Sequence, residues 1–373
     1  CCITNQKIII KNMRKIVLLL IASLFVLGIK AQEIKQEKKT VSVELPQWVK
    51  DIKLSGYGML QYQAQDPYST TTDEEGNIIT EKNASNTFNI RLLRLMLDGK
   101  IGDVAWRAQF QGSGSSAFLV DLYAEWQKYR EIRVKAGQFK RAFTFESPTN
   151  PIDQGFYSYA LVINNLVGYG DRTGEKSAGG RDIGVQLQGD LLKNKAGRYL
   201  LHYQVGVYNG EGINTKDADN RKDIIGGLWL MPVEGLRIGA FGWTGSRAGV
   251  GTKNRYALSA EYSKNDWTFR SEYIHSQGAA APGKNLGDKA DGLYAFGIAP
   301  VIPKKLYAKA RYNMYRQDKS WSSSKTMYEM GINYVICKNL QVNMEYARVN
   351  DRTIANPDKH NYNFVDLQLD FRF

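Results

Sequence analysis

The stretch "VDLQLDFRF", residues 365–373, alternates apolar and polar residues without interruption and ends on an aromatic ring. Successive side chains of a β-strand point to opposite faces, so this alternation predicts a strand with one apolar and one polar face. The apolar face would carry Val365, Leu367, Leu369, Phe371 and Phe373, and the polar face Asp366, Gln368, Asp370 and Arg372. A fold that uses such a strand must offer it a different environment on each side.

The same period of two recurs along the chain from residue 51 onward. In "DVAWRAQFQ", residues 103–111, Val104, Trp106 and Phe110 fall on one face and Arg107 and Gln109 on the other. Alternating runs of this kind predict about sixteen strands, most with the roughly 9 to 11 residues that a tilted strand needs to cross a bilayer. We expect them over residues 52–63, 87–99, 103–111, 117–127, 131–141, 181–190, 199–208, 223–231, 236–243, 255–263, 267–276, 291–299, 306–315, 326–336, 340–349 and 363–373.

The links between these runs alternate in length. Links after even-numbered strands are short, such as "KIG", "PVEG" and "KND", whereas most links after odd-numbered strands are longer, with "GSGSS" after the third strand as the exception. The longer links cover residues 64–86, 142–180, 209–222, 244–254, 277–290, 316–325 and 350–362. Membrane barrels have short periplasmic turns and long external loops, so the pattern predicts an even number of strands with both ends of the sheet on the periplasmic side.

Soluble β-sandwiches and propellers also contain strands of period two, and the alternation alone does not say which face is inside. Arg, Lys, Asp, Gln and Asn recur on one face of nearly every strand, and Tyr and Trp lie near strand ends. These features and the alternating link lengths favour a membrane barrel. The fold class predicted is therefore all-β, a transmembrane antiparallel barrel of about sixteen strands with a long loop folded inward.

The N-terminal segment "MRKIVLLLIASLFVLGIKAQ", residues 13–32, is typical of a secretory signal peptide. Arg14 and Lys15 precede an apolar run, and Ala31 lies at a plausible cleavage position. We therefore divide the chain into residues 1–32, which comprise upstream residues and a signal peptide starting at Met13, a periplasmic lead-in over 33–50 and a barrel over 51–373. Loss of residues 1–32 removes five basic and no acidic residues, lowers the formal charge from +13 to +8 and leaves Cys337 as the one cysteine. We expect the protein in the outer membrane of a Gram-negative bacterium.

Four stretches resemble a known family: "FNIRLLRLMLDGKI" (88–101), "VKAGQFKRAFTFES" (134–147), "VGVYNGEG" (205–212) and "LDFRF" (369–373). On these the chain resembles the outer-membrane porins related to the phosphate-selective porins O and P, in the version common in Bacteroidetes, and the second stretch is the most specific. The resemblance implies a sixteen-stranded porin that forms a homotrimer. Many members of this family lack the dense arginine ladder and lysine cluster of the selective channels. The ending at Phe371 and Phe373 also resembles the signal read by the barrel-assembly machinery, a further expected partner.

The longest predicted link, residues 142–180, is the natural candidate for a loop that constricts the channel, because its aromatic and apolar residues can pack on the inner wall. Basic residues near it and on the polar strand faces are candidates for lining the pore and binding anions through charge-assisted hydrogen bonds. They are Arg94, Arg107, Arg133, Lys135, Arg141, Arg172, Lys176, Arg181, Arg270, Lys309 and Arg311. The alternative is that polar residues of both signs only keep water in the pore.

The leading functional hypothesis is a channel for passive diffusion of small hydrophilic solutes, with a preference for anions such as phosphate left open. The alternative is a closed outer-membrane barrel with a structural or surface-binding role, in which residues 142–180 plug the lumen. Lipid and lipopolysaccharide are further expected partners. With three histidines and Cys337 as the only cysteine after export, no metal, cofactor or catalytic pair is expected, although a barrel enzyme could use His202 or His275. Export and the dispersed basic residues argue against nucleic-acid binding.

Overall fold

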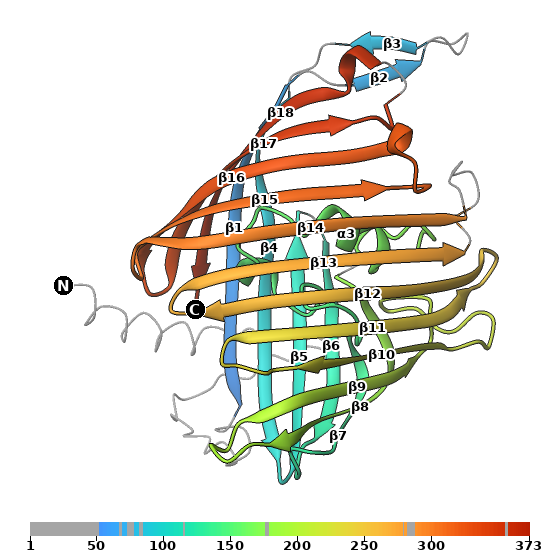
Figure 1. Ribbon diagram of the computed structural model, residues 1–373, viewed down its shortest axis with the longest axis vertical. Coiled ribbons are helices and arrows are strands. Elements are labelled where there is room, and N and C mark those ends of the chain that lie inside the picture. Colours follow the sequence, from blue (N-terminus) through green and yellow to red (C-terminus); the bar gives the residue numbers. More distant parts are fainter. Residues whose placement is uncertain are drawn as a thin grey trace, which may run out of the picture.

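Sixteen antiparallel strands form a closed barrel in the computed structural model (Figure 1), which describes residues 52–66, 69–72, 78–81, 85–114, 116–175, 179–278, 280–281, 288–354 and 357–373. Each strand pairs with its neighbours in chain order, and β1 closes the sheet by pairing with both β4 and β18. The barrel strands are β1 (Lys53–Gln65), β4 (Ser85–Ile101), β5 (Val104–Ser113), β6 (Ser116–Trp126), β7 (Arg133–Lys140), β8 (Arg181–Lys193), β9 (Tyr199–Tyr208), β10 (Asp223–Leu230), β11 (Leu236–Arg247), β12 (Gly251–Lys264), β13 (Trp267–Gly278), β14 (Lys289–Ile302), β15 (Leu306–Arg316), β16 (Ser324–Cys337), β17 (Leu340–Asp351) and β18 (Asn361–Arg372).

The helical elements are few and short in the described ranges. They are α3 (Leu161–Leu166) and the 3-10 turns Pro151–Asp153, Trp321–Ser323 and Pro357–Lys359. No helix in this part of the chain is long and apolar enough to cross a membrane. The expected signal peptide and lead-in, residues 1–50, lie outside the described residues.

The sequence prediction of sixteen strands is confirmed, with two differences in the links. The first predicted long link contains a small two-stranded sheet, β2 (Ser69–Thr72) with β3 (Ile78–Glu81), which Figure 1 shows beyond the end of β18. The predicted long link 244–254 is wrong. Strands β11 and β12 extend until Arg247 pairs with Gly251, which leaves only residues 248–250 between them. The glycine-rich sequence there hides the strand, because ladder hydrogen bonds use the backbone and do not need an alternating side-chain pattern.

Polar side chains are buried and apolar ones exposed along the barrel strands. On β12, Arg255 and Glu261 are buried, whereas Leu258 is 55% exposed. On β18, Asp366 is 1% exposed and Leu367 37% exposed. A soluble protein shows the opposite arrangement, and a barrel in lipid requires this one. The two faces predicted for residues 365–370 are therefore confirmed, while Phe371 is half-buried and Arg372 exposed.

The first and last strands meet at a seam in which two glycines make room for two aromatic rings. Gly56 and Phe373 exchange backbone hydrogen bonds of 3.0 Å in both directions. A Cβ atom on Gly58 would lie 2.3 Å from the ring of Phe371, and one on Gly56 would lie 2.5 Å from the ring of Phe373. Side chains at these two positions would therefore force the rings off the seam.

Candidate functional site

The link between β7 and β8, residues 141–180, contributes about half of the large apolar cluster of the described structure. Phe143, Phe145 and Ile163 are buried in it. The loop packs on wall residues from β11, β13 and β14, among them Phe241, Trp243, Ile274 and Tyr294. Helix α3 contacts β13, β14 and β15 and is drawn within the outline of the barrel in Figure 1. The wall thus carries an apolar patch where this loop lies, amid an otherwise polar face.

Wall side chains also satisfy the backbone of the loop. The carboxylate of Glu272 accepts the N–H groups of Phe145 and Glu146 at 2.6 and 2.9 Å. Asn313 Oδ1 accepts the N–H of Leu161 at 2.9 Å. Lys309, Arg311 and Arg255 donate to the carbonyl oxygens of Gly155, Ser158 and Leu166. Backbone groups that form no regular ladder need such partners when buried, so these contacts fix the path of the loop.

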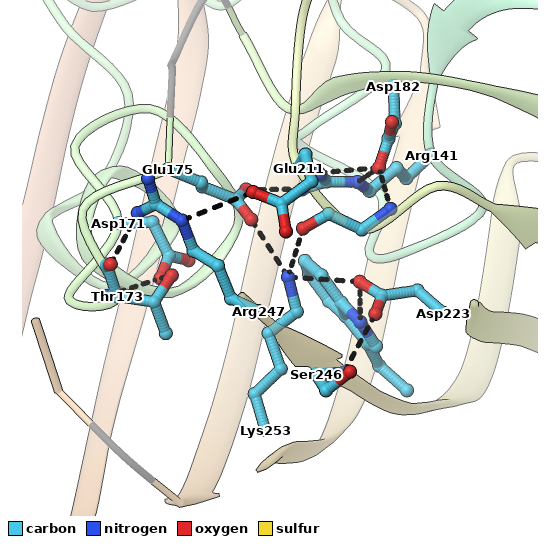
Figure 2. A network of polar contacts seen from close by, with 12 residues as sticks. Arg141, Asp171, Thr173, Glu175, Asp182, Glu211, Asp223, Ser246, Arg247 and Lys253 are labelled. Atoms are coloured by element: carbon cyan, nitrogen blue, oxygen red, sulfur yellow. Dashed lines mark hydrogen bonds and ion pairs between the residues drawn. The ribbon is translucent and has the colours of Figure 1, made fainter. Parts of the chain in front are cut away.

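A buried ion-pair network joins the loop to the wall (Figure 2). Arg141 lies 2.5 Å from Glu175 and 2.9 Å from Asp182. Lys253 of β12 lies 2.9 Å from Glu175 and 3.0 Å from Asp223. None of these side chains is more than 1% exposed. The alternating charges compensate one another away from water, where an unpaired charge would be costly.

Trp243 of β11 lies among three buried cations. The side chains of Arg141, Lys253 and Arg255 lie 4.8, 5.2 and 4.6 Å from the centre of its ring system. Its indole Nε1 donates to Asp223 at 2.9 Å. Cation–π contacts in a desolvated site are worth about 2 kcal/mol or more each, and the indole also shields the cations from solvent. The ring therefore stabilises the same network from the wall side.

Two carboxyl groups of the loop have shifted pKa values of opposite sign. Burial raises the pKa of Glu146 to about 7, although Arg311 lies 3.7 Å away and opposes the shift. Burial also acts to raise the pKa of Asp171, but the ion pair with Arg255 outweighs it and the pKa is lowered. Glu146 Oε1 has no hydrogen-bond partner in the described part of the chain, which agrees with a site that disfavours its charged form.

The basic residues selected from the sequence are mostly paired with carboxylates. The pairs are Arg107–Asp98 (2.7 Å), Arg133–Asp190 (3.3 Å), Lys135–Glu125 (3.7 Å), Arg141–Glu175 (2.5 Å), Arg181–Asp121 (2.6 Å), Arg270–Glu261 (2.5 Å), Lys309–Glu345 (2.6 Å) and Arg311–Glu329 (2.6 Å). Arg94 instead donates two hydrogen bonds to Gln111. Arg172 is 2% exposed, and Lys176 lies outside the described residues.

Burial separates these basic residues into two groups. The side chains of Arg141, Arg181, Lys309 and Arg311 are at most 1% exposed. Arg141 belongs to the loop 141–180, and Lys309 and Arg311 donate to its backbone. Arg107, Arg133 and Lys135 are 18 to 32% exposed. The first group is placed to anchor the loop, and only the second presents charge to water.

A cavity of about 200 Å³ lies between the loop and the wall formed by β5 to β9. Its lining contains five cationic residues, one carboxylate and several amides: Arg107, Lys135, Lys140, Arg141, Arg181, Asp121, Gln109, Asn150, Gln186, Gln188 and Gln204. Lys140 donates to the carbonyls of Ser147 and Thr149 and to the hydroxyl of Tyr159. In the described ranges it has no carboxylate within ion-pair distance.

Sequence reasoning missed several wall residues that hold the loop, namely Asp223, Trp243, Lys253, Arg255 and Glu272. For the two of these residues on β12, Lys253 and Arg255, the sequence did contain a signal. They lie on the same polar face of "GTKNRYALSAEYSK" as Ser259 and Glu261. The predicted strand began at residue 255, which left Lys253 in a link. The partners of these residues are distant in sequence, and no local pattern indicates them.

Residues 57–219 match the family model described as phosphate-selective porin O and P. This part of the chain is similar to that porin family. The Bacteroidetes subtype stays a prediction.

Solved porins share the fold of the chain at low sequence identity. An anion-selective porin from Comamonas acidovorans matches with a TM-score of 0.61 and 12% identity, over 86% of this chain and 99% of its own. The outer-membrane channel DcaP of Acinetobacter baumannii and OmpF of Salmonella typhi in complex with daunomycin each match with a TM-score of 0.58 and 11% identity, over 86% of this chain and 97% of theirs. None of the curated proteins matches the sequence. At these identities the likeness concerns the fold, and the porin family and fold point to a channel rather than an enzyme.

Proposed function

We propose that this protein is an outer-membrane porin through which small hydrophilic solutes diffuse passively. The observation that carries the proposal is the burial pattern of the closed barrel, with polar side chains such as Arg255 and Asp366 inside and apolar ones such as Leu258 outside. A polar interior of a barrel this wide holds water unless loops fill it. The family match over residues 57–219 supports the same reading.

The loop 141–180 narrows this channel from within. Its anchors are side chains on the buried polar faces of the strands, including Glu272, Asn313 and Lys309 from β13 and β15. The side chain of Arg372 on β18 also lies 2.7 Å from Asp153 of the loop. A loop held by inward-facing side chains of strands this far apart must cross the interior, so solutes would pass beside it, along the cavity next to β5–β9.

The lining of that cavity supports a modest preference for anions. Arg107 and Lys135 are partly exposed there, but Asp98 and Glu125 compensate much of their charge. Fixed positive charge beside a narrow passage raises the local concentration of anions. Because most cations of the interior are paired, we infer weak anion preference and not a dense phosphate ladder.

Conductance in planar lipid bilayers tests the proposal. The purified protein should produce discrete current steps, and under a KCl gradient the reversal potential should lie on the anion-selective side. A barrel that inserts but carries no current would support the alternative, a closed barrel with a structural or surface-binding role. Reversal on the cation-selective side would overturn the anion clause and leave the channel clause intact.

Assembly into homotrimers is a further part of the proposal. A solved trimer form of OmpT from Vibrio cholerae, folded in vitro, matches the fold with a TM-score of 0.52 and 13% identity, over 86% of this chain and 99% of its own. The outer face near the β1–β4–β18 seam carries Leu60, Phe88 and Ile90, and Phe88 is 85% exposed. Chemical crosslinking of the native protein in detergent should give a trimer band, and a monomer alone would contradict this clause.

A further inference from the structure

Lys253 is a buried lysine of β12 whose ammonium group meets three oxygen atoms. Its Nζ lies 2.9 Å from Glu175 Oε2, 2.9 Å from the carbonyl oxygen of Gly210 and 3.0 Å from Asp223 Oδ2 (Figure 2). The side chain is 1% exposed. An ammonium group has three N–H donors, so these three acceptors saturate it without any water.

The three acceptors belong to three different parts of the chain. Glu175 lies in the loop 141–180, Gly210 in the link 209–222, and Asp223 at the start of β10. Arg247 also joins the two segments, because it donates to the carbonyl oxygen of Thr173 and lies 3.6 Å from Glu211, but its side chain is 21% exposed. Lys253, at 1% exposed, is therefore the buried point at which the proposed constriction loop and a second long link are held together.

Further contacts tie the second link to the same network. Gly210 donates its N–H to Asp182 Oδ2 at 2.9 Å, the same carboxylate oxygen that accepts from Arg141. Its φ of 89° lies in the region that favours glycine, and a Cβ there would come within 2.8 Å of Asp223 Oδ1. The backbone of the link is thus packed against the carboxylates that Lys253 neutralises. A displacement of either segment would break contacts of the other.

We propose that Lys253 is a positioning residue that couples the loop 141–180 to the link 209–222 and thereby sets the width of the solute passage. This inference rests on the proposed channel function. Without the ammonium group, Glu175 and Asp223 would face each other with one buried cation fewer, and a buried carboxylate left without compensation moves toward water. Both segments should then loosen together, because each has lost the partner that it shared.

The first test replaces Lys253 by methionine, which keeps the length of the side chain and removes the charge. Channels of Lys253→Met should show a rise in unitary conductance of roughly two-fold and should admit larger polyethylene glycols, because a displaced loop widens the passage. Lys325→Met is the matched control, since the partners of Lys325 are Asp351 and Tyr362 of the wall. Unchanged conductance and polymer exclusion in folded Lys253→Met channels would overturn the inference.

Restoring the charge chemically separates positioning from a general loss of packing. In a chain whose own cysteines are replaced by serine, Lys253→Cys is treated with 2-bromoethylamine in the denatured state and then refolded in detergent. The product carries an ammonium group at nearly the reach of lysine. Wild-type conductance should return after this treatment and not after treatment with iodoacetamide. Failure of the aminoethylated chain to recover would contradict a role for the charge.

The coupling is tested by changing a residue of the loop 141–180 and measuring the effect on the link 209–222. Glu175→Gln leaves Lys253 in place and removes its ion pair with the loop, together with the ion pair between Arg141 and Glu175, so the test does not depend on the folding of the lysine variant. Trypsin should then cut faster at Lys216, Arg221 and Lys222 of the link, by roughly ten-fold if about 1.4 kcal/mol of holding energy is lost. In Lys253→Met the same second change should speed cleavage less than it does alone, because only the Arg141–Glu175 ion pair remains to be lost. Unchanged cleavage of the link in Glu175→Gln would refute the coupling.

These outcomes distinguish the inference from the proposed function. A wild-type protein without current would refute the channel and leave the trypsin test of coupling readable. A conducting wild type whose link is unaffected by Glu175→Gln would leave the channel in place and reject the role of Lys253.

Discussion

Arg255 of β12 and Asp171 of the loop form a two-point ion pair, with Nη1 2.5 Å from Oδ2 and Nη2 2.9 Å from Oδ1. Neither side chain is exposed to solvent. The same guanidinium donates to the carbonyl of Leu166, so one wall residue fixes both the end of α3 and the turn after it. The loop is therefore attached by charge as well as by its aromatic residues.

Replacing Asp171 by asparagine should destabilise the loop strongly. The change leaves the Arg255 guanidinium buried with a neutral partner, and breaking a buried pair from one side costs about 3–5 kcal/mol. We expect a lower midpoint of thermal unfolding in detergent for Asp171→Asn. The double variant Asp171→Asn with Arg255→Met should recover part of the loss, because no unpaired charge remains. Strict additivity of the two changes would contradict a direct pairing.

The buried carboxyl of Glu146 should make the loop more stable in mild acid. Its pKa in the folded protein is about 7, above the ordinary value of 4.5, so the folded state holds the proton more tightly between these two pH values. The free energy of unfolding should therefore fall as pH rises from about 4.5 to 7 and change little above that, by an amount on the order of 3 kcal/mol. Thermal unfolding between pH 5 and pH 8 measures this. Glu146→Gln should lose this part of the pH dependence, and an unchanged profile in that variant would exclude Glu146 as its source.

A side chain at Gly292 should push helix α3 away from the wall. A Cβ atom at Gly292 of β14 would lie 2.7 Å from Val162 of α3 and 2.6 Å from the carbonyl oxygen of Met314. Overpacking of this kind costs roughly 1–3 kcal/mol. Gly292→Ala should raise amide hydrogen exchange over residues 161–166, measured by mass spectrometry. Gly242→Ala is the control, because a Cβ at Gly242 has no atom within 4 Å. Equal exchange in both variants would contradict direct packing of α3 on β14.

Selectivity should respond to the exposed cations and not to the buried ones. Arg107 is 32% exposed beside the proposed passage, whereas Arg311 is 1% exposed and donates to the carbonyl of Ser158 in the loop. Arg107→Gln should move the reversal potential under a KCl gradient toward zero. Arg311→Gln should lower thermal stability and leave the sign of the selectivity unchanged. The opposite result would mean that Arg311, and not Arg107, faces the ions.

The strand framework could be predicted from sequence because the alternation of β18 and its fifteen companions is a local property of the chain. The side of each strand that faces the lumen could also be predicted, once polar residues were assigned to the interior. The anchors of the loop could not be predicted in the same way. Lys253 and Glu175 are 78 residues apart and Arg255 and Asp171 are 84 apart, and only closure of the barrel brings them together. Arg141 and Arg311 are residue types expected to line a pore. Their burial among carboxylates depends on contacts with residues distant in sequence, which no short sequence pattern indicates.

In our proposal, this barrel is an open channel narrowed by a loop that wall residues hold in place. Unitary conductance of the purified protein in planar bilayers, compared with that of Asp171→Asn, tests it most directly. We expect discrete current steps for the wild type and larger steps for the variant, since a loosened loop widens the passage. A silent wild type, or equal steps in the two proteins, would contradict it.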